Sequence, residues 1–179
     1  MKALSTLFIL FLGIYSYGAP LPATSSSMIV NQKKGLFMST HGFRIHSENT
    51  LWEHTGSPFE NPNILTIYKS PKTNGGQRAA LTVRIDKIDK PRKLKNYINS
   101  WKKDYLRFGF NILNSKRIKL NRKSAYLLDL SNTNSNKQLR QLIYMKKKKA
   151  VILTCRGEKS NFSTIVKSCN SIFRNFSWM

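Results

Sequence analysis

The sequence predicts a single α+β domain in which a largely antiparallel sheet has helices on both faces. The segments typical of strands and helices follow the order β-β-β-α-β-β-β-β-α. Several predicted strands are apolar at successive positions, namely 127–128, 142–143 and 151–153. Such strands are usually covered on both faces of a sheet. Because one helix cannot cover both faces, we expect the two helices on opposite sides.

The first half of the chain is predicted to supply short strands. Gly42 separates the earliest extended pieces, and a turn-forming cluster (70–76) separates the later ones. The stretch 50–63 contains Gly and Pro residues and is predicted to be a loop. The expected strands are 28–30, 36–39, 43–46, 64–69 and 79–85.

The second half begins with a change of period. Apolar residues from Leu94 onward recur at i, i+3, i+4, i+7, i+11 and i+14, which places them on one face of a helix. Asp89 and Pro91 are typical of a helix start, and Gly109 is typical of its end. Helical spacing returns over 162–176. The strands expected between the two helices are 110–114 continuing toward 118–120, 124–130, 138–145 and 150–155.

The N-terminus has the features of a signal peptide. A single lysine precedes an apolar run, and the small residues Ser16 and Gly18 suit a signal-peptidase site before Ala19. The alternative is an uncut membrane anchor, but the run is shorter than the ~20 residues that span a bilayer. We expect no other membrane-spanning stretch and a periplasmic or secreted location. The predicted divisions are a signal peptide (1–18), a flexible lead-in (19–35) and one domain (36–179).

Cys155 and Cys169 are the only two cysteines. Outside the cytoplasm such a pair favours a disulfide bond, which for a loop of this length stabilises by roughly 3 kcal/mol in the entropy model. Two buried thiols are the alternative. A zinc site built from four cysteines is excluded, and the scarcity of carboxylates argues against a calcium site.

Charge is the most unusual property of the chain. It has 31 Lys and Arg residues against 8 Asp and Glu, a formal net charge of +23. Such a field attracts anionic partners, so we expect binding to an anionic surface or an acidic protein, with only non-specific binding to nucleic acid. A solvated hairpin tip is the alternative for the lysine run. The candidate binding residues are Lys146, Lys147, Lys148, Lys149, Lys116, Arg117, Lys119, Arg122 and Lys123.

Aromatic residues beside these cations allow two interpretations. Trp101 adjoins two lysines and Tyr144 adjoins the lysine run, an arrangement that could stack nucleic-acid bases beside positive charge. Trp101 also lies on the apolar face of its predicted helix, which favours core packing.

No catalytic residue, metal site or cofactor is predicted. His41, His46 and His54 lie close in sequence with Glu48 and Glu53, but their spacing fits no HExxH-like frame, so we interpret them as surface or loop histidines. The glycine pair 75–76 lacks the Lys and Ser/Thr of a phosphate-binding loop and is predicted to be a turn, and no G-x-S-x-G element is present.

Four segments resemble the PsbP-like family. GFRI at 42–45 resembles the family's opening strand, and Trp52 resembles the tryptophan that follows that strand. The segment 146–154 resembles the family's basic hairpin and the strand after it, which ends in Thr. The segment 162–176 resembles the closing helix. The Pro-Gly pair that usually precedes the tryptophan is absent. The resemblance implies an α/β/α sandwich and a binding or accessory role, since members share no catalytic constellation.

The sequence therefore favours an exported, non-enzymatic binding or accessory domain that acts at the cell envelope or outside it. One alternative is a secreted, nuclease-like enzyme that uses the histidine and glutamate cluster on a polyanion. Another is a purely structural accessory subunit whose charge serves solubility. The oligomeric state is not determined by any of these patterns.

Overall fold

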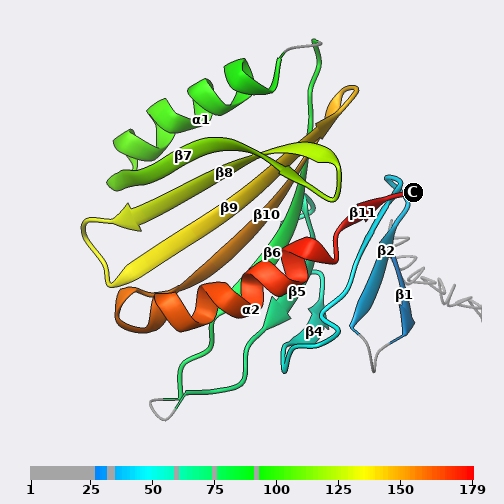
Figure 1. Cartoon of the computed structure of the whole chain (residues 1–179), viewed down its shortest axis with the longest axis horizontal. Coiled ribbons are helices and arrows are strands. Elements are labelled where there is room, and N and C mark those ends of the chain that lie inside the picture. Colours follow the sequence, from blue (N-terminus) through cyan, green and yellow to red (C-terminus); the bar gives the residue numbers. More distant parts are fainter. Residues whose placement is uncertain (1–26, 32–34, 59–60, 74–75, 91–92) are drawn as a thin grey trace, which may run out of the picture.

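A seven-stranded antiparallel sheet forms the centre of the molecule, in the order β4-β5-β6-β10-β9-β8-β7. A second sheet has the order β1-β2-β3-β11 (Figure 1). The computed structural model describes residues 27–31, 35–58, 61–73, 76–90 and 93–179. The elements are β1 (Ser27–Asn31), β2 (Leu36–Ser39), β3 (Phe43–Ile45), β4 (Glu53–Gly56), β5 (Ile64–Lys69), β6 (Ala80–Lys87), α1 (Leu94–Arg107), β7 (Phe110–Leu120), β8 (Lys123–Asn132), β9 (Lys137–Lys146), β10 (Lys149–Glu158), α2 (Phe162–Arg174) and β11 (Ser177–Trp178).

The two α-helices lie on opposite faces of the large sheet (Figure 1). Tyr97 of α1 clusters with Ile143 and Ile152, whereas Phe173 of α2 clusters with Leu142 and other residues that alternate with these along the strands. Successive side chains of a strand point to opposite faces, so the two clusters are separated by the sheet. The predicted α+β architecture with helices on both faces is confirmed.

The second sheet shares the face that α2 covers. Its aromatic residues Phe37 and Phe43 belong to the same buried cluster as the α2 residues. After α2 the chain continues through Phe176, whose ring centroid lies 5.4 Å from that of Phe43. Strand β11 then pairs with β3, with Trp178 opposite Phe43. The C-terminal residues are thereby fixed beside the start of the domain.

The cysteines form a disulfide bond between Cys155 of β10 and Cys169 of α2. Both residues are completely buried in the cluster between α2 and the sheet. The predicted pairing is confirmed, and it ties the last long strand to the helix that covers it.

Three elements differ from the prediction. The stretch 50–63 is not one loop, because β4 pairs with β5 along the edge of the large sheet. Its sequence, EHTG, has a single β-branched residue and no large apolar side chain, so it lacks the pattern by which strands are recognised. The pairing is irregular between His54 and Gly56. Strand β7 is continuous over the two pieces expected between 110 and 120, and β11 was not expected.

Strand β1 pairs with β2 and includes the short strand expected at 28–30. It lies within the segment predicted to be a flexible lead-in. The predicted signal peptide (1–18) and the remainder of that lead-in, up to residue 26 and over 32–34, lie outside the described residues. None of the helices in the described ranges combines the length and the apolar character needed to cross a membrane.

Candidate functional site

Two hairpin tips place most of the predicted cations at one end of the large sheet. The β9–β10 hairpin closes between Lys146 and Lys149, which face each other across the last strand pair. The β7–β8 hairpin closes in the same way between Leu120 and Lys123. Charged residues are well tolerated at such exposed turns, where nothing needs to be buried.

Strand register brings the two tips side by side. Ala125 of β8 pairs with Tyr144 of β9, so that Lys123 and Lys146 follow two residues further along neighbouring strands. At the other side of β10, Lys149 faces Lys87 of β6. We call this surface the basic end of the sheet; it consists of Lys87, Lys119, Arg122, Lys123, Lys146, Lys147, Lys148 and Lys149.

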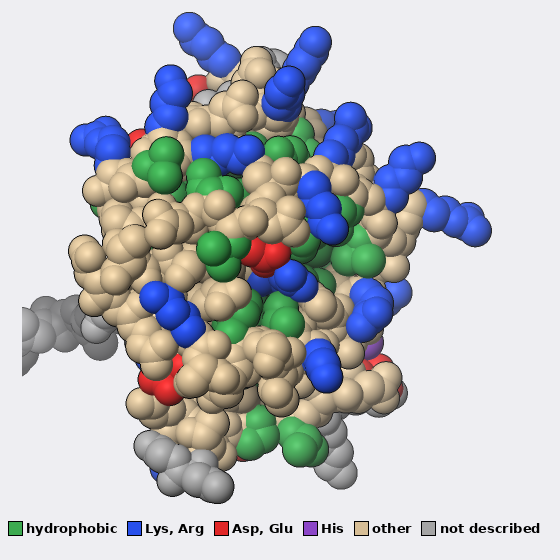
Figure 2. Space-filling view, turned by 60° about the vertical axis from the view of Figure 1, so that its left-hand side comes forward, with side chains coloured by type: hydrophobic (Ala, Val, Ile, Leu, Met, Phe, Trp, Pro, Cys, Tyr) green, Lys and Arg blue, Asp and Glu red, His purple; other side chains and the backbone are tan. Residues whose placement is uncertain are grey.

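The positive charge of this region is not cancelled nearby. Among the described residues, none of the nine predicted cations takes part in an ion pair. The only carboxylate between Asp104 and Glu158 in the sequence is Asp129, which is bound by Arg140. On the face shown in Figure 2, Lys and Arg side chains clearly outnumber carboxylates.

His41 responds to this field. The pKa of its imidazole is lowered by burial, and further by the positive charges of Lys149 and Lys87. The loop between β2 and β3 therefore lies close enough to the basic end to experience its charge.

A tryptophan lies beneath the lysine run. The Lys146 Nζ atom lies 5.1 Å from the centre of the Trp178 ring, a cation–π distance. The same indole packs edge-on against Phe176, with ring centroids 5.4 Å apart. The contact fixes one lysine of the tip over an aromatic surface and leaves the terminal Met179 exposed beside it.

The remaining predicted cations, Lys116 and Arg117, line a groove of about 610 Å³ between β7 and the first turn of α1. Tyr126 also lines it. The hydroxyl groups of Tyr126 and Ser115 are hydrogen-bonded at 3.0 Å, and the Lys102 Nζ atom lies 5.5 Å from the Tyr126 ring centre. The Ser115 hydrogen bond lowers the pKa of Tyr126; burial opposes this shift, and the charge of Lys102 adds to it.

Lys93 and Lys95 also line this groove, and neither is among the nine cations predicted from the sequence. A signal for part of it was present, because Lys95 and Lys102 are seven residues apart and so share one face of α1. What the sequence did not show is that this face lies over the outer part of β7 and β8.

The two aromatic residues considered for base stacking are used in packing. Trp101 lies between Tyr97 and Tyr105, and the Arg84 guanidinium lies 4.6 Å from its ring centre. Tyr144 is 1% exposed and stacks on Phe176 at 4.4 Å. Neither ring offers a free face to a nucleic-acid base.

The histidines occupy structural positions. The His54 Nε2 atom is hydrogen-bonded to the Thr66 hydroxyl at 2.5 Å, and its ring packs between Phe37 and Tyr68. The interpretation as a surface or loop residue is wrong for His54, because β4 turns this side chain toward the core. His46 lies 3.4 Å from a Glu48 carboxylate oxygen. Over the described ranges, His, Cys, Asp and Glu side chains form no group of three that suits a metal ion.

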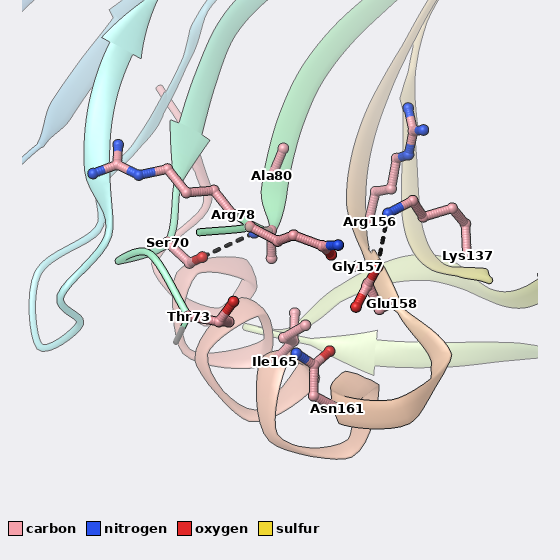
Figure 3. A pocket seen from close by; sticks show the side chains of 12 residues that line it. Ser70, Thr73, Arg78, Ala80, Lys137, Arg156, Gly157, Glu158, Asn161 and Ile165 are labelled. Atoms are coloured by element: carbon pink, nitrogen blue, oxygen red, sulfur yellow. Dashed lines mark hydrogen bonds and ion pairs between the residues drawn. The ribbon is translucent and has the colours of Figure 1, made fainter. Parts of the chain in front are cut away.

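A second cavity, of about 220 Å³, lies at the opposite end of the sheet (Figure 3). It forms because β6 begins only at Ala80, whereas its antiparallel neighbour β10 continues past that position to Glu158. The loop between β5 and β6 forms one wall, and the start of α2 forms another. Gly76 donates a backbone hydrogen bond to Thr73 in that loop, as expected of a turn; Gly75 lies outside the described residues.

Solved structures with the same arrangement of elements are known. PsbP from the cyanobacterium Synechocystis superposes with a TM-score of 0.55 at 11% identity, over 88% of this chain and 95% of that protein. The chain has a PsbP-like fold. A Pseudomonas aeruginosa protein of unknown function superposes on this PsbP-like chain with a TM-score of 0.56 at 13% identity, over 79% of it and 94% of the other protein. No protein-family model and no curated protein matches the sequence.

Proposed function

We propose that this PsbP-like protein is a non-enzymatic binding module that acts outside the cytoplasm and holds an anionic partner at the basic end of its sheet. The observation that carries the proposal is the juxtaposition of the two hairpin tips, where Lys123 and Lys146 lie on neighbouring strands and no described carboxylate pairs with either. Cations from separate parts of the sequence thereby act on one ligand.

Binding at this surface is driven by charge. The lysines of the tip are exposed or half-exposed, so their ammonium groups meet the partner without a large cost of desolvation. The groove of Lys95, Lys116 and Arg117 extends the positive surface along the edge of the sheet. An extended polyanion or an anionic surface, rather than a small molecule, contacts cations distributed in this way.

Support for a binding role over an enzymatic one comes from two of the three histidines. The His54 side chain is hydrogen-bonded to Thr66 and packs on the core, and burial lowers its pKa and so favours its neutral form. His41 lies beside the basic end, but no carboxylate of the described residues pairs with it to form an acid–base couple.

The extracytoplasmic location is supported by the signal-like N-terminal sequence and by the disulfide bond. Intact-mass analysis of protein from the native envelope tests it. A mass beginning at Ala19 is expected, and a mass that retains Met1 or Lys2 would contradict cleavage and favour an uncut anchor.

Affinity measured across a salt series tests the binding proposal. The ligands are heparin, duplex DNA and vesicles of anionic lipid, and the variant replaces Lys146, Lys147, Lys148 and Lys149 with Ser. For DNA the log–log salt slope should become less steep by ~0.9 for each phosphate that the variant no longer neutralises. The melting temperature should change little, because the tip is exposed.

A variant of equal net charge provides the matched control. It replaces Lys69, Lys72, Lys159 and Lys167, which lie outside the basic end, with Ser. If both variants show the same decrease in affinity, only the overall charge matters and the proposed site is wrong. Absence of binding by the wild-type protein at low salt would leave the charge with a role in solubility alone.

A further inference from the structure

The cavity at the opposite end of the sheet has a chemistry unlike that of the rest of the surface. Two of its four charged side chains form an ion pair, with Lys137 Nζ 3.4 Å from a Glu158 carboxylate oxygen. A third, Arg78, donates a 2.9 Å hydrogen bond to Glu53, which lies outside the cavity lining. The Arg156 guanidinium points away from Asn161 and Ile165 (Figure 3). The remaining cation of the lining, Arg156, therefore directs its charge away from the part of the cavity beside Asn161 and Ile165.

Hydrogen-bonding groups within it are unused. The Asn161 Oδ1 atom is inaccessible to solvent and has no hydrogen-bond partner among the described residues. Asn161 immediately precedes α2, where an Asn side chain ordinarily caps the helix, yet it makes no such bond. The side chains of Thr73 and Gln77 also line the cavity, and neither bonds to a residue that the structure describes.

The identity of the required ligand group follows from the amide. The two ends of an Asn side chain differ only in whether they accept or donate, and either orientation leaves a buried polar atom unpaired. A hydroxyl group both donates and accepts, so it satisfies Asn161 in either orientation once the amide rotates to bring the buried atom to the cavity surface. Thr73 and Gln77 each offer a donor and an acceptor to further hydroxyl groups.

Size and lining restrict the ligand further. A volume of 220 Å³ corresponds to roughly seven waters of ~30 Å³ each, which is too small for a nucleotide or a larger cofactor. Ala80, Gly157 and Ile165 supply an apolar side against which carbon-bound hydrogens can pack. We infer that this cavity binds a neutral, hydroxyl-rich molecule of the size of one sugar residue.

NMR titration of the ¹⁵N-labelled protein tests the inference, with D-glucose and N-acetyl-D-glucosamine as probes and succinate as an anionic comparison. One of the sugars should give saturable shifts of the Gly157, Glu158 and Asn161 amides with millimolar affinity. These shifts should be independent of ionic strength, unlike binding at the basic end. The two proposals therefore fail independently.

Asn161→Ala should abolish the saturable shifts, and the melting temperature should stay the same because the side chain makes no capping bond to lose. Thr73→Val, which removes a hydroxyl group at nearly constant volume, is a second variant that should weaken them. Ser163→Ala, an exposed change in the first turn of α2, is the control and should bind as the wild type does. Absence of saturation with both sugars, full retention of binding by Asn161→Ala, or stronger and salt-sensitive binding of succinate would each overturn the inference.

Discussion

Arg140 binds Asp129 through two hydrogen bonds, from Nε at 2.6 Å and from Nη2 at 2.9 Å. The two residues face each other across strands β8 and β9. Asp129 is 6% exposed, so its charge depends on this partner for solvation. The pair also engages the only carboxylate between Asp104 and Glu158 in the sequence, and so contributes to the uncancelled positive charge of that region.

Arg140→Met should destabilise the fold by roughly 3 kcal/mol. The substitution leaves the Asp129 carboxylate without its cationic partner. The expected loss is at the low end of the range for breaking a buried ion pair, because the Arg140 side chain is 23% exposed. Urea unfolding measures the change. The double variant Arg140→Met with Asp129→Leu should recover most of the loss, and a double variant that is less stable than Arg140→Met would contradict this account.

Replacing Cys155 and Cys169 with Ala should cost about 3 kcal/mol, the entropic value for a loop of this length. In parallel, thiol titration of the unfolded, unreduced wild-type protein should find no free thiol. Two free thiols would contradict the bond, and a disulfide-linked dimer that disappears on reduction would contradict the pairing within one chain.

Stability should decrease as the pH falls through 6.5, the ordinary pKa of histidine. Burial lowers the pKa of His54 in the folded protein, so the unfolded chain binds the proton more readily. The stabilisation that comes from neutral His54 is fully present above pH 6.5, and it is lost as the pH falls toward the lowered pKa of His54 in the folded protein. Urea midpoints on either side of 6.5 measure the effect. His54→Gln, whose side chain can still form a hydrogen bond with Thr66, should reduce the pH dependence of the urea midpoint. If that pH dependence were unchanged in the variant, it would come from other groups such as His41.

The regular elements of the fold could be predicted because their patterns are local. The spacing of Leu94, Tyr97, Ile98 and Tyr105 identifies α1 without reference to any other segment. Strand β4 could not be predicted in this way. Its residues have no strand pattern of their own, and they are extended because β5 offers a free edge.

The candidate site was predictable only in part, for a related reason. The sequence shows that Lys146 and Lys123 each belong to a basic segment, but not that these segments meet. Their proximity depends on the order of strands in the sheet and on the β8–β9 register. The cavity beside Asn161 gave no signal in the sequence, because it results from the late start of β6 beside a longer neighbour, β10.

The close packing of α2 on the sheet leads to a last prediction. A methyl group at Gly157 would lie 2.5 Å from Ile165 Cδ1, a distance that forces a shift. Gly157→Ala should therefore destabilise the protein by about 1 kcal/mol, the low end for overpacking, because the atom that must move is the end of a half-buried side chain. Ile165→Val removes the Cδ1 atom and costs ~0.5–1.5 kcal/mol alone.

The double variant Gly157→Ala with Ile165→Val should then be more stable than the sum of the two single changes predicts, since each substitution relieves the problem that the other creates. Urea unfolding of all four proteins gives the coupling energy. Strict additivity would show that α2 moves as a whole to accommodate the methyl group. In that case the cavity that both residues line would change shape, and the amide shifts of Asn161 would report it.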